Sequence, residues 1–302
     1  MPVHGPWPLD LQGPDFEVSD PRFELDGIRQ VTVGSAALGG RGDISLYVPT
    51  GTGPGEQLPV VLLLHGSYGS HWAWFGKGGA HRTARRLASA GTIRPMVLAC
   101  PSDGLWRASS GYVDQPGGAF ETWIVQDAVG AVRRLLDLRP ETAPLFIAGL
   151  SMGGHGALRL GAKHAGLFAG ISAHSSVTRV GPMTESVREA TSLDAIPPAE
   201  LDILGWMERR REDLPPLRFD CGTGDHLAAG NRLLHGSLVA SGIAHVYAEF
   251  PGGHTWEYWE AHLEDTLVFF ESVLRGAMPS TVSGGSVGTS GDAVRRPSVA
   301  AQ

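Results

Sequence analysis

Short apolar runs that alternate with helical patterns constrain the fold of this 302-residue chain more than any other feature. A mainly hydrophobic run of this length is typical of a strand that is buried on both faces. The runs cover residues 60–64, 95–100, 145–149, 167–173, 217–221 and 245–250. Between them, segments 79–90, 121–138, 152–165, 227–241 and 256–275 carry helix signals. In 121–138 the apolar residues recur at intervals of three and four, so one face of that helix is expected to be buried.

This alternation predicts parallel βαβ units, and therefore an α/β fold. We expect a mostly parallel central sheet with helices on both of its faces. Two earlier β-type runs, 31–33 and 44–48, are separated by glycines. They predict an antiparallel hairpin at the N-terminal edge of the sheet.

The composition along the chain divides it into three parts. Residues 1–27 are predicted to form an N-terminal arm lying over the domain, 28–276 a single domain, and 277–302, which contain no aromatic residue, a disordered tail. Residues 174–216 interrupt the strand–helix alternation and contain several prolines. An insertion at this place is often a lid or a pocket wall, so we expect it to be lid-like.

Charge and hydropathy exclude several classes of partner. The net charge is -7, and the only basic cluster, 209–211, is flanked by acidic residues, which argues against a nucleic-acid partner. No run of about 18 apolar residues and no signal-peptide pattern is present, so we expect a cytoplasmic protein without a membrane partner. Cys100 and Cys221 end apolar runs, and we expect buried thiols rather than a disulfide.

A nucleophile motif lies at the end of the run 145–149. Residues 149–153 read Gly-Leu-Ser-Met-Gly, which fits the pattern G-x-S-x-G. The motif requires a strand, a sharp turn and a helix in this order, and the flanking patterns predict that order. Glycine is needed at positions 149 and 153 because side chains there would crowd the neighbouring strand and helix. We therefore assign Ser151 as the nucleophile.

A serine nucleophile needs a histidine to accept its proton and a carboxylate to orient that histidine. In α/β-hydrolases the chain order is serine, acid, histidine, each in a loop after a strand. Among the histidines of the C-terminal third, His254 alone lies just beyond the last strand and just before a helix. His235 and His262 fall inside helix patterns, and His245 begins a strand. We assign His254 as the base.

Asp225 is the predicted acid, because it directly follows the run 217–221. Asp220 lies within that strand and is a poorer choice. An aspartate just before a helix pattern is also a common N-cap. Capping of the helix that begins near Leu227 therefore remains the alternative role of Asp225.

Two backbone N–H groups are needed to bind the oxyanion of the tetrahedral intermediate. The N–H of Met152, directly after the nucleophile, is the first candidate. The second should come from the loop after the run 60–64, where Ser67 is our choice and Tyr68 the next. His65, in the same loop, is expected to be structural rather than a second base.

The substrate pocket is expected among aromatic residues that follow strand ends. The candidates are Tyr68, Trp72, Trp106 and Trp256, together with Glu121. Glu121 opens a helix, so capping of that helix is an equally good interpretation. The proposed chemistry requires neither a metal nor an organic cofactor.

Several segments of the sequence resemble the putative-esterase family of α/β-hydrolases. This family includes S-formylglutathione hydrolases, tributyrin-type esterases, feruloyl esterases and mycolyltransferases. The resemblance is carried by residues 64–66, the long elbow segment 149–158, the stretch 225–231 and the segment 252–259. It spans about residues 28 to 275 and implies the α/β-hydrolase fold. The family's nucleophile, acid and base fall on Ser151, Asp225 and His254, and its second oxyanion donor falls on Ser67.

Together these features predict a serine carboxylic-ester hydrolase that acts on short-chain or small acyl esters. The expected partner is a small-molecule ester, and the sequence is compatible with a homo-oligomer. An acyltransferase that uses the same triad with an alcohol or amine acceptor is the main alternative. A non-catalytic binding protein on a hydrolase scaffold is a second alternative, disfavoured by the complete triad.

Overall fold

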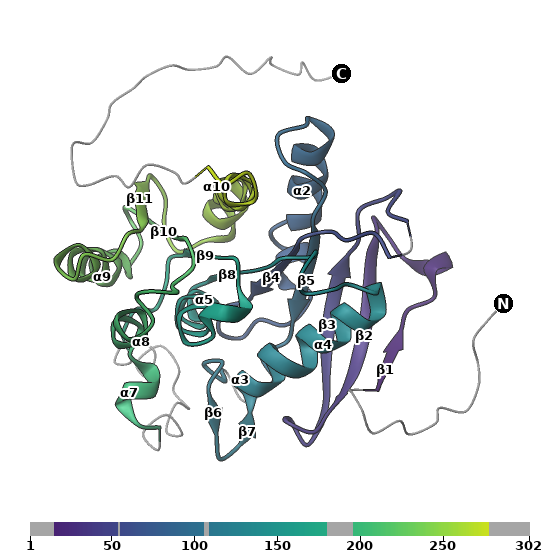
Figure 1. The fold of residues 1–302 in the computed structure, drawn as a ribbon, viewed down its shortest axis with the longest axis horizontal. Coiled ribbons are helices and arrows are strands. Elements are labelled where there is room, and N and C mark those ends of the chain that lie inside the picture. Colours follow the sequence, from purple (N-terminus) through teal and green to yellow (C-terminus); the bar gives the residue numbers. More distant parts are fainter. Residues whose placement is uncertain (1–14, 54, 106–108, 180–195, 278–302) are drawn as a thin grey trace.

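The structure of the protein is a computed structural model. It describes residues 15–53, 55–105, 109–179 and 196–277. Figure 1 shows a central sheet with helices on both sides of it.

The described residues form one nine-stranded sheet in the order β1-β2-β3-β5-β4-β8-β9-β10-β11. Its strands are β1 Phe16–Val18, β2 Ile28–Ser35, β3 Gly40–Tyr47, β4 Val60–Leu64, β5 Val97–Pro101, β8 Leu145–Leu150, β9 Gly170–His174, β10 Leu217–Gly222 and β11 Val246–Phe250. The pairings from β1 through β3 to β5 are antiparallel, and those from β5 to β11 are parallel. The predicted mostly parallel sheet with an antiparallel N-terminal edge is confirmed. A small hairpin pairs β6 Asp114–Gln115 with β7 Gly118–Ala119.

The helices cover the sheet in two layers. They are α1 Ala73–Gly76, α2 Ala80–Ser89, α3 Phe120–Thr122, a π-helical stretch Trp123–Ala128, α4 Val129–Leu136, α5 Met152–Lys163, α7 Pro198–Leu201, α8 Ile203–Arg209, α9 Ala228–Ala240 and α10 Trp256–Leu274. Short 3₁₀ turns occupy Pro21–Phe23 and Ala165–Leu167. Apolar residues of α4, α5, α8 and α9 pack in one core, and those of α2 and α10 pack in the other.

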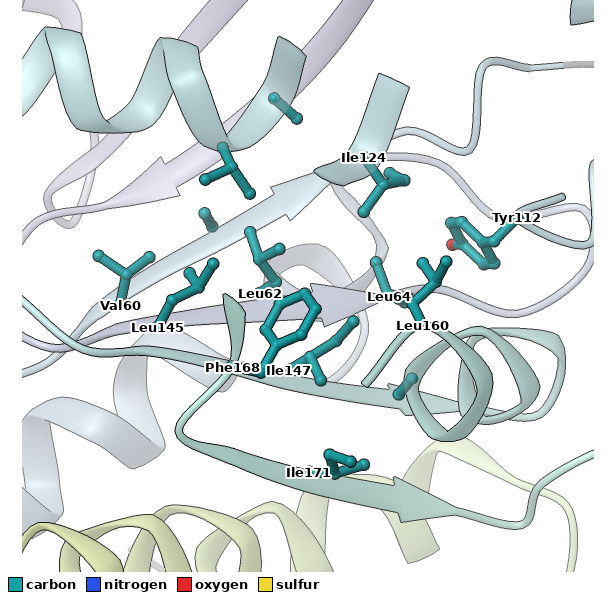
Figure 2. Packing of buried hydrophobic residues seen from close by; sticks show 14 of the residues in the cluster. Val60, Leu62, Leu64, Tyr112, Ile124, Leu145, Ile147, Leu160, Phe168 and Ile171 are labelled. Atoms are coloured by element: carbon teal, nitrogen blue, oxygen red, sulfur yellow. The ribbon is translucent and has the colours of Figure 1, made fainter. Parts of the chain in front are cut away.

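Successive residues of the central strands alternate between these two cores. Val60, Leu62 and Leu64 of β4 belong to the core under α5, whereas the residues between them belong to the core under α10. All five residues of β4 are buried, so this strand reads as one continuous apolar run. Figure 2 shows Val60, Leu62 and Leu64 together with Leu145 and Ile147 of β8. The period-two geometry of a strand thus explains why unbroken hydrophobic runs mark the middle of the sheet.

Two predicted segments differ in the structure. Residues 16–18, which we assigned to an arm over the domain, form β1 and extend the sheet through pairing with β2. The predicted helix 121–138 begins with α3, continues through a π-helical stretch and ends as α4 at Leu136. The buried Trp123 lies in this stretch, and its indole N–H donates to the Ser102 carbonyl oxygen at 2.7 Å. The π-helical stretch thus coincides with tertiary packing of Trp123. The spacing of apolar residues in the sequence cannot reveal such a local change of helix type.

Of the predicted insertion, residues 180–195 lie outside the described residues. The remainder includes α7 and α8, and α8 packs against α5. Residues 278–302 also lie outside the described part, so the predicted tail stays a prediction. Cys100 and Cys221 are free and buried, as expected. None of the described helices is long and apolar enough to span a membrane.

Candidate active site

Ser151 lies at a sharp turn between β8 and α5. Its φ of 56° and ψ of -117° are unusual for a residue with a side chain, and such strain is typical of a nucleophile elbow. The two motif glycines are required by close packing. A Cβ atom at Gly149 would collide with the backbone of Gly153, and one at Gly153 would collide with the carbonyl of Leu64. The turn therefore requires glycine at both of these positions, because any side chain there would collide with the backbone.

The three predicted triad residues come together at the C-terminal ends of β8, β10 and β11. His254 Nε2 lies 3.0 Å from Ser151 Oγ. On the other side of the imidazole, His254 Nδ1 lies 2.8 Å from Asp225 Oδ2. A carboxylate can only accept a hydrogen bond, so the Nδ1 atom that faces Asp225 carries the proton. The Nε2 atom is then free to accept a hydrogen bond from the serine hydroxyl.

Each carboxylate oxygen of Asp225 has its own partner, and the N-cap position of α9 is occupied by Leu227 rather than by Asp225. Oδ2 faces His254, and Oδ1 accepts a hydrogen bond from the Leu227 N–H at 2.8 Å. Burial raises the pKa of Asp225, but the hydrogen bonds from His254 and Leu227 outweigh it and hold the pKa below its ordinary value. The carboxyl group is therefore ionised at neutral pH and able to orient the imidazole.

A pocket of about 340 Å³ opens in front of Ser151. It is lined by Gly66, Ser67, Tyr68, Gly69, Trp72, Ala73, Lys77, Leu150, Ser151, Val177, His226, Leu227, His254, Trp256 and Trp259. The structure thus brings four predicted residues, Ser67, Tyr68, Trp72 and Trp256, together with the nucleophile and the base. Its volume is at the lower end of the range for small-molecule sites.

The loop after β4 is held in place beside the nucleophile. Buried His65 accepts from the Asp103 N–H through Nε2 at 3.1 Å, and its Nδ1 donates to the Gly66 carbonyl at 2.8 Å. Desolvation lowers the pKa of His65, which favours this neutral form. The Tyr112 hydroxyl donates to the His65 carbonyl at 3.0 Å. His65 is therefore structural, as predicted, and it supports the loop that carries Ser67.

Met152 is the first residue of α5 and is fully buried. The first N–H groups of a helix have no acceptor within the helix, and the dipole at that end favours negative charge. Ser67 lines the same pocket as Ser151, the residue that precedes this helix. Both predicted oxyanion donors thus belong to segments that border the nucleophile.

Glu121 does not line the pocket, and its assignment to substrate binding is wrong. Its carboxylate lies 2.5 Å from Arg159 Nη2, 3.0 Å from Lys163 Nζ and 2.7 Å from His164 Nε2. These three partners lie on or next to α5, and they hold Glu121 in a buried ion-pair cluster beneath the surface. Trp106, the other predicted pocket residue, lies outside the described residues.

Asp220, the rejected candidate for the acid, also has a structural role. It is fully buried on β10, where it contacts His174 Nδ1 and Arg218 Nη2, both at 2.9 Å. The Tyr258 hydroxyl donates to it at 2.9 Å. Burial acts to raise the pKa of Asp220, but its interactions with His174 and Arg218 outweigh it and lower the pKa to about 2.

The sequence analysis missed several pocket residues. Lys77, Val177, His226 and Leu227 line the pocket but were not assigned to it. Val177 and the pair His226–Leu227 follow the C-terminal ends of β9 and β10 directly. The rule that ligands bind beyond the carboxyl ends of parallel strands could have found these three.

One group of side chains in the described residues could hold a metal ion. Ligand atoms of Asp225, His226 and His254 lie within 4.8 Å of one another. However, His254 Nδ1 and Asp225 Oδ2 are only 2.8 Å apart, whereas two ligands of a tetrahedral zinc ion lie about 3.3 Å apart. The geometry of this pair is therefore that of a hydrogen bond within the triad.

Comparison with known proteins shows the family of the chain. The family model described as "Putative esterase" matches residues 35–270. An acetyl esterase from Caldicellulosiruptor saccharolyticus is 26% identical over 237 residues, which cover 72% of this chain and 85% of that protein. Among solved structures, a ferulic acid esterase has a TM-score of 0.72 at 23% identity and covers 86% of this chain and 99% of its own.

An S-formylglutathione hydrolase from Staphylococcus aureus has a TM-score of 0.68 at 18% identity, covering 80% of this chain and 97% of its own. These structural likenesses establish the α/β-hydrolase fold. The family match covers the sheet from β3 to β11, the elbow and the segment that contains His254. The chain therefore belongs to the putative-esterase family and is an esterase of the α/β-hydrolase fold.

Proposed function

We propose that this carboxylic-ester hydrolase is a serine esterase that cleaves small acyl esters through an acyl-enzyme on Ser151. The observation that carries the proposal is the continuous hydrogen-bonded chain from Asp225 through His254 to Ser151. It ends at a strained serine that faces a pocket of about 340 Å³.

Acylation begins when Ser151 Oγ attacks the ester carbonyl carbon. His254 Nε2, at 3.0 Å, accepts the hydroxyl proton, and the resulting imidazolium is stabilised by Asp225 at 2.8 Å. The carbonyl oxygen becomes an oxyanion, which the N–H groups of Met152 and Ser67 stabilise. His254 then donates its proton to the alkoxide as the C–O bond breaks and the alcohol leaves.

Deacylation repeats these steps with water as the nucleophile. His254 accepts a proton from water as the water oxygen attacks the acyl carbon. The same two N–H groups stabilise the second oxyanion. Collapse of this intermediate releases the carboxylic acid and returns the proton to Ser151 Oγ.

The dimensions of the pocket support a small substrate. A volume of about 340 Å³ accommodates a short acyl group with a modest alcohol, but few larger esters. The similarity to an acetyl esterase, at 26% identity, agrees with this choice. We therefore expect activity to decrease as the acyl chain lengthens from acetate to octanoate.

The direct test compares wild type, Ser151→Ala and a control on p-nitrophenyl esters from acetate to octanoate. Ser151→Ala should lower kcat by about 10³-fold or more, because the substitution removes the hydroxyl that would carry the acyl group. Ser89→Ala is the matched control, since Ser89 is exposed at the end of α2 and does not line the pocket. Wild-type activity in Ser151→Ala would refute the proposed nucleophile.

Mass spectrometry adds an independent measurement. A fluorophosphonate ester should add one phosphonyl group to the peptide that contains Ser151, and the adduct should be missing from Ser151→Ala. Product analysis with added alcohols or amines distinguishes hydrolysis from acyl transfer. We expect free acid as the main product even when an acceptor is present. Ester or amide as the main product would instead favour an acyltransferase.

A further inference from the structure

A single lysine stands at the wall of the active-site pocket. Lys77 lines the same pocket as Ser151 and His254. Its Nζ lies 5.8 Å from the ring centroid of Trp72 and 5.9 Å from that of Trp256, and both rings also line the pocket. These separations are within the range in which an ammonium group is attracted to an aromatic face. Attraction to the two tryptophan rings thus favours conformations of Lys77 in which its ammonium group lies beside the pocket.

The backbone on both sides of Lys77 is fixed by the same two tryptophans. A Cβ atom at Gly76 would lie 3.1 Å from the Trp72 ring, and one at Gly78 would lie 3.0 Å from the Trp256 ring. The N–H of Lys77 donates to the Ala73 carbonyl at 2.9 Å and so ends α1. Close packing of two glycines against the rings therefore holds the lysine between them.

The ammonium group has no carboxylate partner within 4.0 Å in the described part of the chain. Glu257 and Glu260 lie in the adjoining surface hollow, which Lys77 also lines, but neither forms an ion pair with it. Among the residues that the structure describes, no acidic side chain lines the active-site pocket itself. A net charge of -7 would repel an anionic substrate in general. The exposed Lys77 therefore provides an available positive charge at the wall of the pocket in an otherwise acidic protein.

We propose that the pocket selects esters that carry an anionic group, and that Lys77 is the specificity-determining residue that binds this group. The inference rests on the proposed function, because it names the substrate class of the same site. Lys77 and Ser151 line one pocket of about 340 Å³, so one small molecule can place its carbonyl at Ser151 and its anionic group at Lys77. The tryptophans contact the carbon atoms between the two groups.

The test compares esters in matched pairs that differ in charge. 4-Nitrophenyl hydrogen adipate and 4-nitrophenyl hexanoate have acyl groups of equal length, and only the first is anionic. 4-Acetoxybenzoate and its methyl ester place the charge on the leaving group instead. For each pair, kcat/KM is measured after subtraction of spontaneous hydrolysis, and the anionic-to-neutral ratio is compared between variants. Differences in the intrinsic reactivity of the two esters are the same for every variant, so they cancel when the ratios of two variants are compared.

Lys77→Met should lower the anionic-to-neutral ratio about fivefold in at least one pair, as expected at the upper end for an exposed charge pair. Lys77→Glu should lower it further, and Lys77→Arg should retain it. Arg139→Met removes the same charge at the opposite end of the sheet, next to Gln57, and should leave the ratio unchanged. A ratio that Lys77→Met leaves unchanged in both pairs would overturn the inference.

Failure of this inference is distinguishable from failure of the proposed function. If wild type hydrolyses the neutral esters and Lys77→Met changes neither ratio, the serine esterase stands and only the role of Lys77 is refuted. If wild type hydrolyses none of the four esters, the proposed function fails and this inference fails with it.

Chemical labelling gives a readout that does not depend on turnover. The chain contains only two lysines, and Lys163 is engaged with Glu121 and Glu200 at 3.0 and 2.7 Å. In Ser151→Ala, excess adipate monoester should slow reductive methylation of Lys77, as measured by peptide mass spectrometry. The neutral hexanoate should give less protection at equal concentration. Equal protection by the two esters would contradict recognition of the anionic group.

Discussion

Replacement of Arg159 by methionine should destabilise the protein far more than replacement of a surface arginine. Arg159 is fully buried on α5, and its guanidinium lies 2.5 Å from the carboxylate of Glu121 and 3.3 Å from that of Glu200. It also donates to the Tyr112 carbonyl at 3.3 Å. Methionine fills a similar volume but leaves these acceptors without their cation.

The magnitude follows from the partners that remain. Removal of one member of a buried ion pair costs about 3 to 5 kcal/mol. Lys163 and His164 still contact Glu121 at 3.0 and 2.7 Å, so we expect the lower end of that range, about 3 kcal/mol. For a domain of this size, such a loss lowers Tm by about 6 to 12 °C.

Thermal and urea unfolding, followed by tryptophan fluorescence, provide the assay. Arg86→Met is the matched control, because Arg86 pairs with Glu264 at 2.7 Å on the surface and should contribute at most about 1 kcal/mol. A second substitution, Glu121→Gln, should recover part of the loss by removing the buried charge. If Arg159→Met and Arg86→Met shifted Tm equally, the buried cluster would not stabilise the fold as argued.

The same ion-pair cluster makes the stability of the fold depend on pH. Burial acts to raise the pKa of Glu121, but the His164 hydrogen bond and the Arg159 charge outweigh it and lower the pKa from 4.5 to about 2. A depressed pKa stabilises the folded state above the unfolded value, and this stability is lost as pH falls from about 4.5 towards 2. The difference in stability between wild type and Arg159→Met should therefore be largest above pH 4.5 and shrink below it.

Two further predictions concern the triad and the sheet. Asp225→Asn should lower kcat by about 10³- to 10⁴-fold with little change in Tm, because an amide can no longer hold the imidazole with its proton on Nδ1; a loss below tenfold in steady-state kinetics would refute its orienting role. Gly42→Ala should cost about 1 to 3 kcal/mol in urea unfolding, because its Cβ would collide with the ring of buried Trp123. Gly40→Ala on the same strand meets nothing within 4 Å and should be nearly neutral, so equal effects of the two changes would contradict the packing argument.

The central sheet and the proximity of Ser151, Asp225 and His254 could be predicted because local patterns specify them. The run at Val60–Leu64 matches β4 residue for residue, since a strand buried on both faces leaves no polar position. The elbow and the loops after β10 and β11 could likewise be recognised from the sequence. Each contains glycine, and they follow one another in the order serine, acid, histidine. In these segments the local pattern and the tertiary environment agree.

The errors arose where contacts distant in sequence decide the outcome. Glu121 opens a helix near a strand end, which suits either a pocket or a core, and only its contact with Arg159, 38 residues away, decides between them. Residues 16–18 are too short to signal a strand, and pairing with β2 makes them one. The residues next to Lys77 in the sequence do not indicate that it lines the pocket. Its position depends on two tryptophans that come from different parts of the chain.

The C-terminal edge of the sheet has a consequence for how activity responds to stress. His254 follows β11, an edge strand whose five residues are only half-buried, and its contact with Ser151 spans 103 residues of chain. Peripheral elements with few buried groups open locally at lower free energy than the core does. Detachment of β11 would separate His254 from Ser151 while β4 and β8 remain intact. Heating should therefore abolish turnover before fluorescence or circular dichroism reports global unfolding, and hydrogen exchange should be faster at β11 than at β4.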